Sequence, residues 1–92
     1  MTREESIAIE YLKGNELFKT IKDLPEFVHL CDITFPTKEY HLEFKKAYFW
    51  QKSNPKRQKK NQRRFLTNWL LAAYGVYKPK QEKKQEEVKE KI

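Results

Sequence analysis

The sequence has one cysteine, two glycines and no long hydrophobic run. Cys31 has no second cysteine to form an intramolecular disulfide, and together with His29 and His41 it does not give the spacing of a zinc site. We therefore expect an intracellular protein without a metal or other cofactor. The longest uncharged stretch, 65–77, is too short to cross a bilayer, and residues 1–10 carry acids where a signal peptide needs basic residues. These absences predict a soluble, cytoplasmic chain that is not exported.

Motifs for catalysis are also missing. Gly14 and Gly75 are the only glycines, so the chain has no glycine-rich loop to hold phosphates. The carboxylates of the amino half have no histidine partner in a catalytic motif, and Cys31 has no neighbouring base that the sequence identifies. The sequence therefore predicts that the protein is not an enzyme.

What the chain does have is positive charge in one block. Residues 44–80 hold eleven Lys or Arg and no Asp or Glu, whereas residues 1–43 hold five basic and nine acidic residues, a net charge of −4. Residues 81–92 hold four of each sign, so the whole chain carries +7. A long block without carboxylates attracts polyanions, and nucleic acid is the first candidate when aromatic residues accompany the charge. An anionic membrane surface ranks last, because a small bundle needs the apolar side of its basic helix for the core.

The amino half predicts short helices. Thr2 and Glu5 have the spacing of a capping box, which favours a first helix just after Thr2. A further amphipathic turn or two is expected over 17–24, and Asp23 has the spacing of an N-cap for another helix. Residues 27–35 fit a helix or a strand, and we favour the helix, followed by extended chain before Pro36.

The basic block predicts a helical hairpin. Thr37 is expected to cap a helix over Lys38–Ser53, and a second helix is expected over Arg57–Tyr74, with Gly75 as its left-handed cap. A connector as short as Ser53–Lys56 would make the two helices antiparallel or steeply crossed. The expected fold is all-α: a small helical bundle with a carboxyl-terminal helical hairpin. We divide it into an acidic helical segment, 1–34, a basic hairpin module, 35–77, and a flexible charged tail, 78–92.

The candidate nucleic-acid-binding residues follow from helical spacing. Arg57, Lys60, Asn61, Arg64 and Asn68 would share one face of the second helix, with three more cations, Lys56, Lys59 and Arg63, beside it. The full set is Lys52, Lys56, Arg57, Lys59, Lys60, Asn61, Arg63, Arg64 and Asn68. Cations at the start of a helix oppose its dipole, so their placement favours a binding role over simple solvation of the bundle.

Consecutive aromatic residues suggest a second kind of contact. Tyr48, Phe49 and Trp50 point in different directions on a helix, so at least one faces outward and is available to stack on an unpaired base. For Trp50 and Trp69 we favour a structural role, wedged between the hairpin and the amino-terminal helices.

The order Trp50, Asn54-Pro55, a Lys/Arg cluster with Asn61, then Arg64-Phe65-Leu66-Thr67-Asn68-Trp69-Leu70 resembles the carboxyl-terminal basic module of phage and prophage replication initiators and helicase loaders. More distantly, the segment is similar to the single-strand-binding part of a bacterial primosomal helicase-loading protein. The resemblance covers about 35–75. It implies that Lys56, Arg57, Lys60, Asn61 and Arg64 contact DNA while Phe65, Trp69 and Leu70 hold the hairpin together. The origin-recognition and ATPase parts of that family have no counterpart in these residues.

The leading prediction is a phage-type replication accessory that binds single-stranded DNA without sequence preference. Its acidic amino half would dock on a replicative helicase or its loader, in the cytoplasm and associated with the nucleoid. Two alternatives stay open. One is a helix-turn-helix-like regulator that reads duplex DNA. The other is an inhibitor from a mobile element whose basic block meets an acidic host protein.

Overall fold

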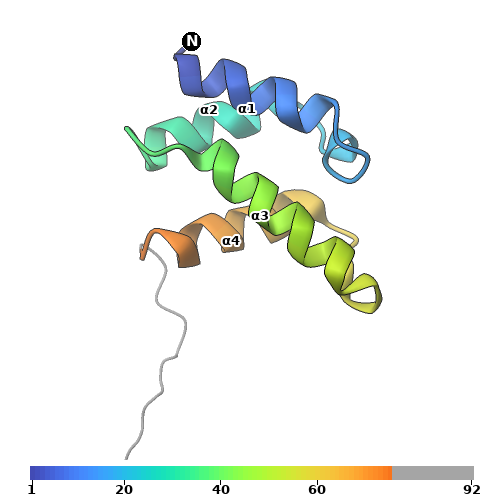
Figure 1. Cartoon of the computed structure of the whole chain (residues 1–92). Coiled ribbons are helices and arrows are strands. Elements are labelled where there is room, and N and C mark those ends of the chain that lie inside the picture. The colour runs from blue at the N-terminus through green and yellow to red at the C-terminus, as the bar shows by residue number, and fades with distance from the viewer. Residues whose placement is uncertain (76–92) are drawn as a thin grey trace, which may run out of the picture.

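The computed structural model describes residues 1–75, which form four α-helices and two short 3-10 turns with no strand among them (Figure 1). The predicted all-α fold is therefore confirmed. The segment predicted as a charged tail, 78–92, lies outside the described residues. Within residues 1–75, no helix combines the length and the apolar content needed to cross a bilayer.

Two helices build the amino half, and each begins at the predicted cap. Helix α1 (Arg3–Lys13) starts after Thr2, whose hydroxyl accepts from the Glu5 N–H at 3.1 Å while the Glu5 carboxylate accepts from the Thr2 N–H at 2.6 Å. Helix α2 (Leu24–Thr34) starts after Asp23, whose carboxylate accepts from the Glu26 N–H at 3.3 Å. The stretch that fitted a helix or a strand is thus helical. Between the two helices, only a single 3-10 turn, η1 (Phe18–Thr20), forms.

Helix α3 (Tyr40–Ser53) ends at the predicted residue but begins two residues late. The prediction that Thr37 caps it was wrong, because Thr37 has a φ of 69°, in the left-handed region, and lies in the turn before the helix. A carboxylate from another helix accepts hydrogen bonds from the first turn of α3 instead. Glu4 of α1 accepts from the His41 N–H at 2.7 Å and from the His41 ring Nδ1 at 2.8 Å. The beginning of α3 is therefore set by a contact with α1.

Helix α4 (Gln62–Ala73) begins five residues later than predicted. Its N-cap is Asn61, whose side-chain oxygen accepts from the Arg64 N–H at 3.0 Å. The connector is therefore residues 54–61 rather than Ser53–Lys56, and it contains the 3-10 turn η2 (Pro55–Arg57). Gly75 has the predicted positive φ, 69°, just after the last turn. Helices α3 and α4 run in opposite directions and cross (Figure 1).

One hydrophobic core joins the helices. Each of the four helices and η1 contributes buried side chains, and those fully shielded from water include Leu12, Phe18, Val28, Tyr40, Phe44, Leu66 and Leu70. Burying a side chain of this size contributes about 1.5–3 kcal/mol. Residues on both sides of the predicted boundary at 34/35 belong to this core, so the amino half is the scaffold against which the basic hairpin packs.

Candidate nucleic-acid interface

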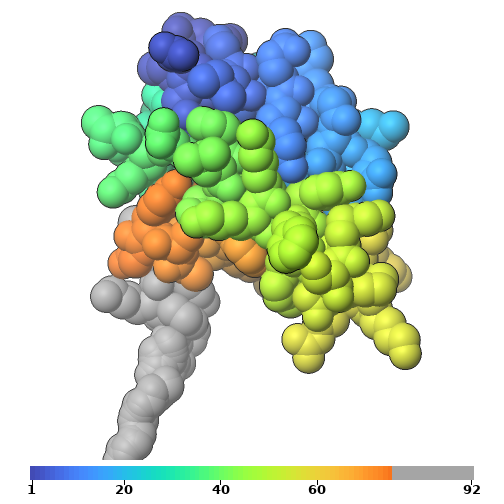
Figure 2. Space-filling model, viewed as in Figure 1, coloured from blue at the N-terminus to red at the C-terminus, as the bar shows by residue number. Residues whose placement is uncertain are grey.

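Five of the candidate residues lie in the connector between α3 and α4. We call residues 55–61 the cationic loop; it projects at one end of the molecule, at the lower right of Figure 2. Its candidates are Lys56, Arg57, Lys59, Lys60 and Asn61, and all five are exposed. Among the described residues, no carboxylate forms an ion pair with any of these four cations. Their charge is therefore available to a ligand.

Two buried glutamines hold the cationic loop in place. Gln51 of α3 donates from Nε2 to Oε1 of Gln62 at 2.8 Å, and Gln62 donates back to Oε1 of Gln51 at 3.2 Å. The Lys59 N–H donates to Gln51 Oε1 at 2.9 Å, and Gln62 Nε2 donates to the Lys59 carbonyl at 2.7 Å. Sequence reasoning missed this pair. The available signal was a glutamine among the apolar residues of α3.

The loop and the start of α4 enclose a shallow hollow of about 250 Å³. We call it the cationic hollow; it is lined by Lys59, Lys60, Asn61, Arg64, Phe65 and Asn68, with no carboxylate among these residues. The helical spacing used to group the candidates was wrong for Arg57 and Lys60, which precede α4. Lys60 still lines the hollow together with Arg64 because it directly precedes the Asn61 cap of α4, whereas Lys56 and Arg57 do not line the hollow.

Two other candidates are paired with carboxylates of the amino half. Lys52 Nζ lies 2.9 Å from Glu16 Oε2, and the hydrogen bond raises the pKa of Lys52. Arg63 Nη1 lies 2.8 Å from Glu26 Oε1, which raises the pKa of Arg63 and lowers that of Glu26. Such exposed pairs contribute only about 0.2–1 kcal/mol each. Lys52 and Arg63 thus connect the two halves and are less available to a ligand than the cations of the loop.

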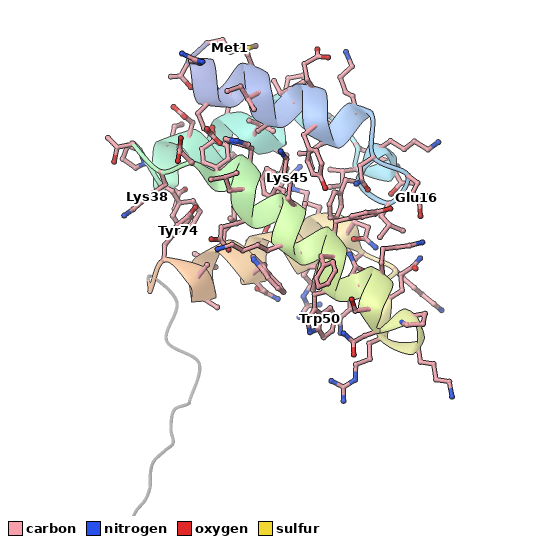
Figure 3. The ribbon with its side chains drawn as sticks, viewed as in Figure 1. Met1, Glu16, Lys38, Lys45, Trp50 and Tyr74 are labelled. Carbon is pink, nitrogen blue, oxygen red and sulfur yellow. The ribbon has the colours of Figure 1, made fainter. Side chains whose placement is uncertain are left out.

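The aromatic run on α3 spreads around the helix as expected. Tyr48 points inward, with its ring centroid 6.3 Å from that of Phe18, whereas Phe49 is 73% exposed, which confirms the predicted outward ring. The side chain of Trp50 projects from the carboxyl-terminal part of α3 (Figure 3). It stacks on Phe65 of α4, with centroids 5.8 Å apart and planes at 29°.

Trp69 completes this aromatic cluster, which we define as Trp50, Phe65 and Trp69. Its ring centroid lies 5.7 Å from that of Phe65 and 6.4 Å from that of Trp50. The ring contacts of Trp50 are with Phe65 and Trp69 of the hairpin, so the favoured wedge against the amino-terminal helices was wrong for Trp50. Trp69 also packs against the core that those helices share. Because both rings are only partly buried, the cluster forms part of the surface.

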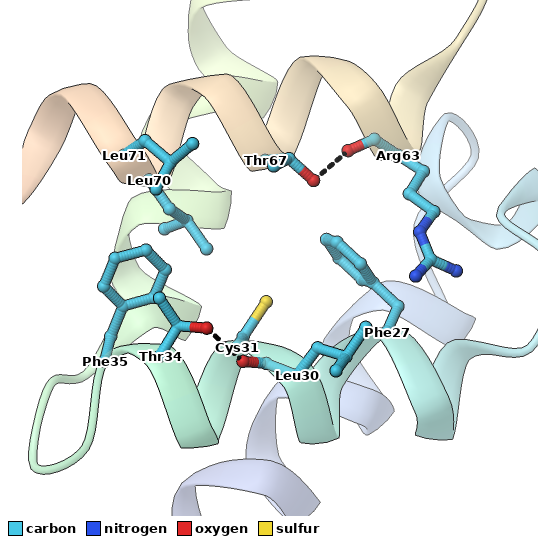
Figure 4. Close-up of a pocket in the computed structure, with 9 residues that line it drawn as sticks. All are labelled: Phe27, Leu30, Cys31, Thr34, Phe35, Arg63, Thr67, Leu70 and Leu71. Atoms are coloured by element: carbon cyan, nitrogen blue, oxygen red, sulfur yellow. Dashed lines mark hydrogen bonds between the residues drawn. The ribbon is translucent and has the colours of Figure 1, made fainter. Parts of the chain in front are cut away.

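A second concavity lies between α2 and α4, away from the cationic hollow. It has a volume of about 310 Å³ and a mostly apolar lining that includes Phe27, Leu30 and Leu70, with Arg63 at one end (Figure 4). Cys31 faces it, and burial raises the pKa of this thiol to about 12. The thiol is protonated at neutral pH, so it does not supply a thiolate nucleophile in this groove.

No family model, curated protein or solved structure matches this chain. The resemblance to phage and prophage replication modules therefore stays a prediction. The cationic hollow and the aromatic cluster beside it are the features from which a function is to be inferred.

Proposed function

We propose that this protein binds single-stranded DNA without sequence preference through the cationic loop and the cationic hollow. The observation that carries the proposal is the convergence of Lys59, Lys60 and Arg64 on one hollow whose lining has no carboxylate. Each ammonium or guanidinium group that neutralises a phosphate releases condensed counterions, which is the main source of non-specific affinity for nucleic acid. The hollow therefore suits a phosphate backbone.

The neighbouring rings favour an unpaired strand over a duplex. Phe65 lines the cationic hollow and stacks on Trp50, so a strand whose phosphates occupy the hollow brings its bases close to partly exposed rings. Unpaired bases have free π-faces that stack on such rings with little dependence on sequence. The bases of a duplex are already stacked on one another, and their faces are not available.

Binding of duplex DNA is a second candidate, supported by one feature of α4. Arg64 and Asn68 are exposed and lie one turn apart, and these residue types read guanine and adenine edges in the major groove. The connector is less suitable. Residues 54–61 make it twice as long as the turn of about 3–4 residues in helix-turn-helix proteins.

The biological setting that we propose is phage-type DNA replication, with a replicative helicase or its loader as the protein partner. The resemblance over about 35–75 supports this setting, and the acidic amino half supports a separate docking surface. An acidic host protein that binds the cationic loop is the competing partner. Capture of a protein partner that survives nuclease treatment, and that the cationic-loop substitutions abolish, would favour this competitor.

The test compares two triple variants that lose the same charge. Lys59→Gln/Lys60→Gln/Arg64→Gln removes three cations of the hollow, whereas Arg3→Gln/Lys13→Gln/Lys19→Gln removes three exposed cations of the amino half. Anisotropy of labelled single and double strands is measured over a range of salt concentrations. Because each neutralised phosphate of a single strand contributes about 0.7 to the slope of log K against log salt, the first variant should lower that slope by about 2.

The matched variant should leave the slope and the affinity close to those of the unaltered protein. Equal losses in both variants would show that net charge, and not the hollow, is responsible, and would overturn the proposal. Preference of the unaltered protein for duplex would support the regulator instead.

A further inference from the structure

The most exposed aromatic ring in residues 1–75 is not part of the cationic hollow. Phe49 borders another hollow, of about 440 Å³, which is distinct from the cationic hollow and from the groove between α2 and α4. We call it the aromatic hollow; it is lined by Lys45, Lys46, Phe49, Trp50, Ser53, Asn54 and Trp69. A large ring held in water next to two indoles and two lysines requires an explanation, since nothing in the described residues covers it.

The indoles around Phe49 are fixed in orientation. Trp69 Nε1 donates to Oε1 of Glu43 at 3.1 Å, and the other oxygen of Glu43 accepts from Lys46 Nζ at 3.1 Å. Trp50 is held on one side by its stacking contact with Phe65, and the Lys59 ammonium lies 5.9 Å from the centroid of Trp50. The rings therefore form a preorganised surface, which lowers the entropy cost of binding a flat ligand.

The aromatic hollow lies next to the cationic hollow, across the stacked rings of Trp50 and Phe65. Trp50 lines the first, Phe65 lines the second, and these two rings are stacked. Lys59 is close to both hollows, since it lines the cationic hollow and its ammonium lies over the ring of Trp50. A ligand that spans both hollows must therefore combine negative charge with flat rings, which is the chemistry of an unpaired nucleic-acid strand.

We propose that Phe49 and Trp50 form a stacking site for unpaired bases of a strand whose phosphates occupy the cationic hollow. The inference rests on the function proposed above and deepens it, because it assigns the preference for single strands to a site outside the cationic hollow. Lys45 places further positive charge at the rim, where the strand would continue, whereas Lys46 is paired with Glu43.

The experiment uses the fluorescence of Trp50 and Trp69, the two tryptophans of the chain, both at this site. Oligothymidylate and an abasic strand with the same number of phosphates are titrated into the full chain. The base-carrying strand should quench the tryptophans and bind more tightly, whereas the abasic strand should bind through charge alone. Phe49→Ala should weaken binding of oligothymidylate by about 5- to 150-fold, the range for loss of a stacked ring, and leave the abasic strand unaffected.

Two variants control this result. Phe49→Tyr keeps a ring and should retain the affinity for oligothymidylate. Ile33→Ala removes an exposed apolar side chain from α2, away from both hollows, and should have no effect. Because Phe49 is exposed, circular dichroism of Phe49→Ala should match that of the unaltered protein.

The possible failures are distinguishable. Equal affinity for the base-carrying and abasic strands would overturn the stacking site and leave the cationic site standing. Failure of the unaltered protein to bind either strand would overturn both proposals. If Phe49→Ala dissociates a dimer while its affinity for DNA is unchanged, the ring belongs to a contact between copies of the chain, and the stacking site is again overturned.

Discussion

Gln51 and Gln62 form a reciprocal amide pair between α3 and α4, with exposed fractions of 0% and 6%. The backbone of Lys59 adds one further hydrogen bond to each member of the pair. A buried polar network of this kind is favourable only when its members are satisfied. The pair therefore couples the packing of the hairpin to the position of the cationic loop.

Replacing one member of this pair should destabilise the protein more than replacing both. Gln51→Ala leaves Gln62 Oε1 and the Lys59 N–H without a partner, and we expect the free energy of unfolding to fall by about 1–3 kcal/mol. In Gln51→Leu/Gln62→Leu both side-chain amides are removed. The free energy of unfolding should therefore fall less in this double variant than in Gln51→Leu or Gln62→Leu alone. Urea denaturation followed by circular dichroism measures each value. Gln58→Ala, at an exposed loop position, is the control and should change little.

Thr37 should be a position where glycine increases stability. Its φ of 69° is unfavourable for a β-branched residue, and glycine adopts this region without a steric cost. We expect Thr37→Gly to raise the free energy of unfolding by about 0.5–1 kcal/mol, because the relief of strain is partly offset by the greater freedom of glycine in the unfolded chain.

The control for this variant is the same substitution in a helix. Thr34→Gly, at the end of α2, should lower the free energy of unfolding by about 1 kcal/mol. Thermal unfolding of the two variants should therefore shift in opposite directions. A lower melting temperature for Thr37→Gly would contradict the proposed strain.

Glu5 should make the fold sensitive to acid. The hydrogen bond from the Thr2 N–H, followed by that with His29, lowers the pKa of Glu5 below its ordinary value of 4.5. Because the pKa is lowered in the folded state, the contribution of Glu5 is complete above about pH 4.5 and is lost as the pH falls through the folded value. Glu5→Gln keeps a capping-box residue but should flatten this part of the stability profile. Glu10→Gln, on an exposed side chain, should preserve the acid dependence.

Local signals in the sequence were sufficient for the amino half of the fold. The Thr2 capping box and the Asp23 cap each act within three residues, and both helices begin where those signals predict. The starts of α3 and α4 depend on contacts that are distant in sequence. Glu4 accepts a hydrogen bond from His41, in the first turn of α3, from 37 residues away. Gln51 accepts a hydrogen bond from Lys59, in the connector that precedes α4.

The candidate site was predictable in its composition but not in its geometry. The lack of carboxylates in the basic block drew attention to the right stretch of chain, and Lys59, Lys60 and Arg64 do lie together. Local spacing could not show that Glu16 and Glu26 pair with two of the candidates, since 36 and 37 residues separate the partners.

The pairing of Lys52 and Arg63 with carboxylates also leaves the positive charge of the molecule unevenly distributed. Excess positive charge gathers around the projecting loop, while α1, at the top of Figure 2, carries acidic side chains. If the protein binds a polyanion as proposed, this uneven charge would turn the loop towards the ligand. Such orientation acts before contact and accelerates encounter, within a screening length of about 8 Å at physiological salt.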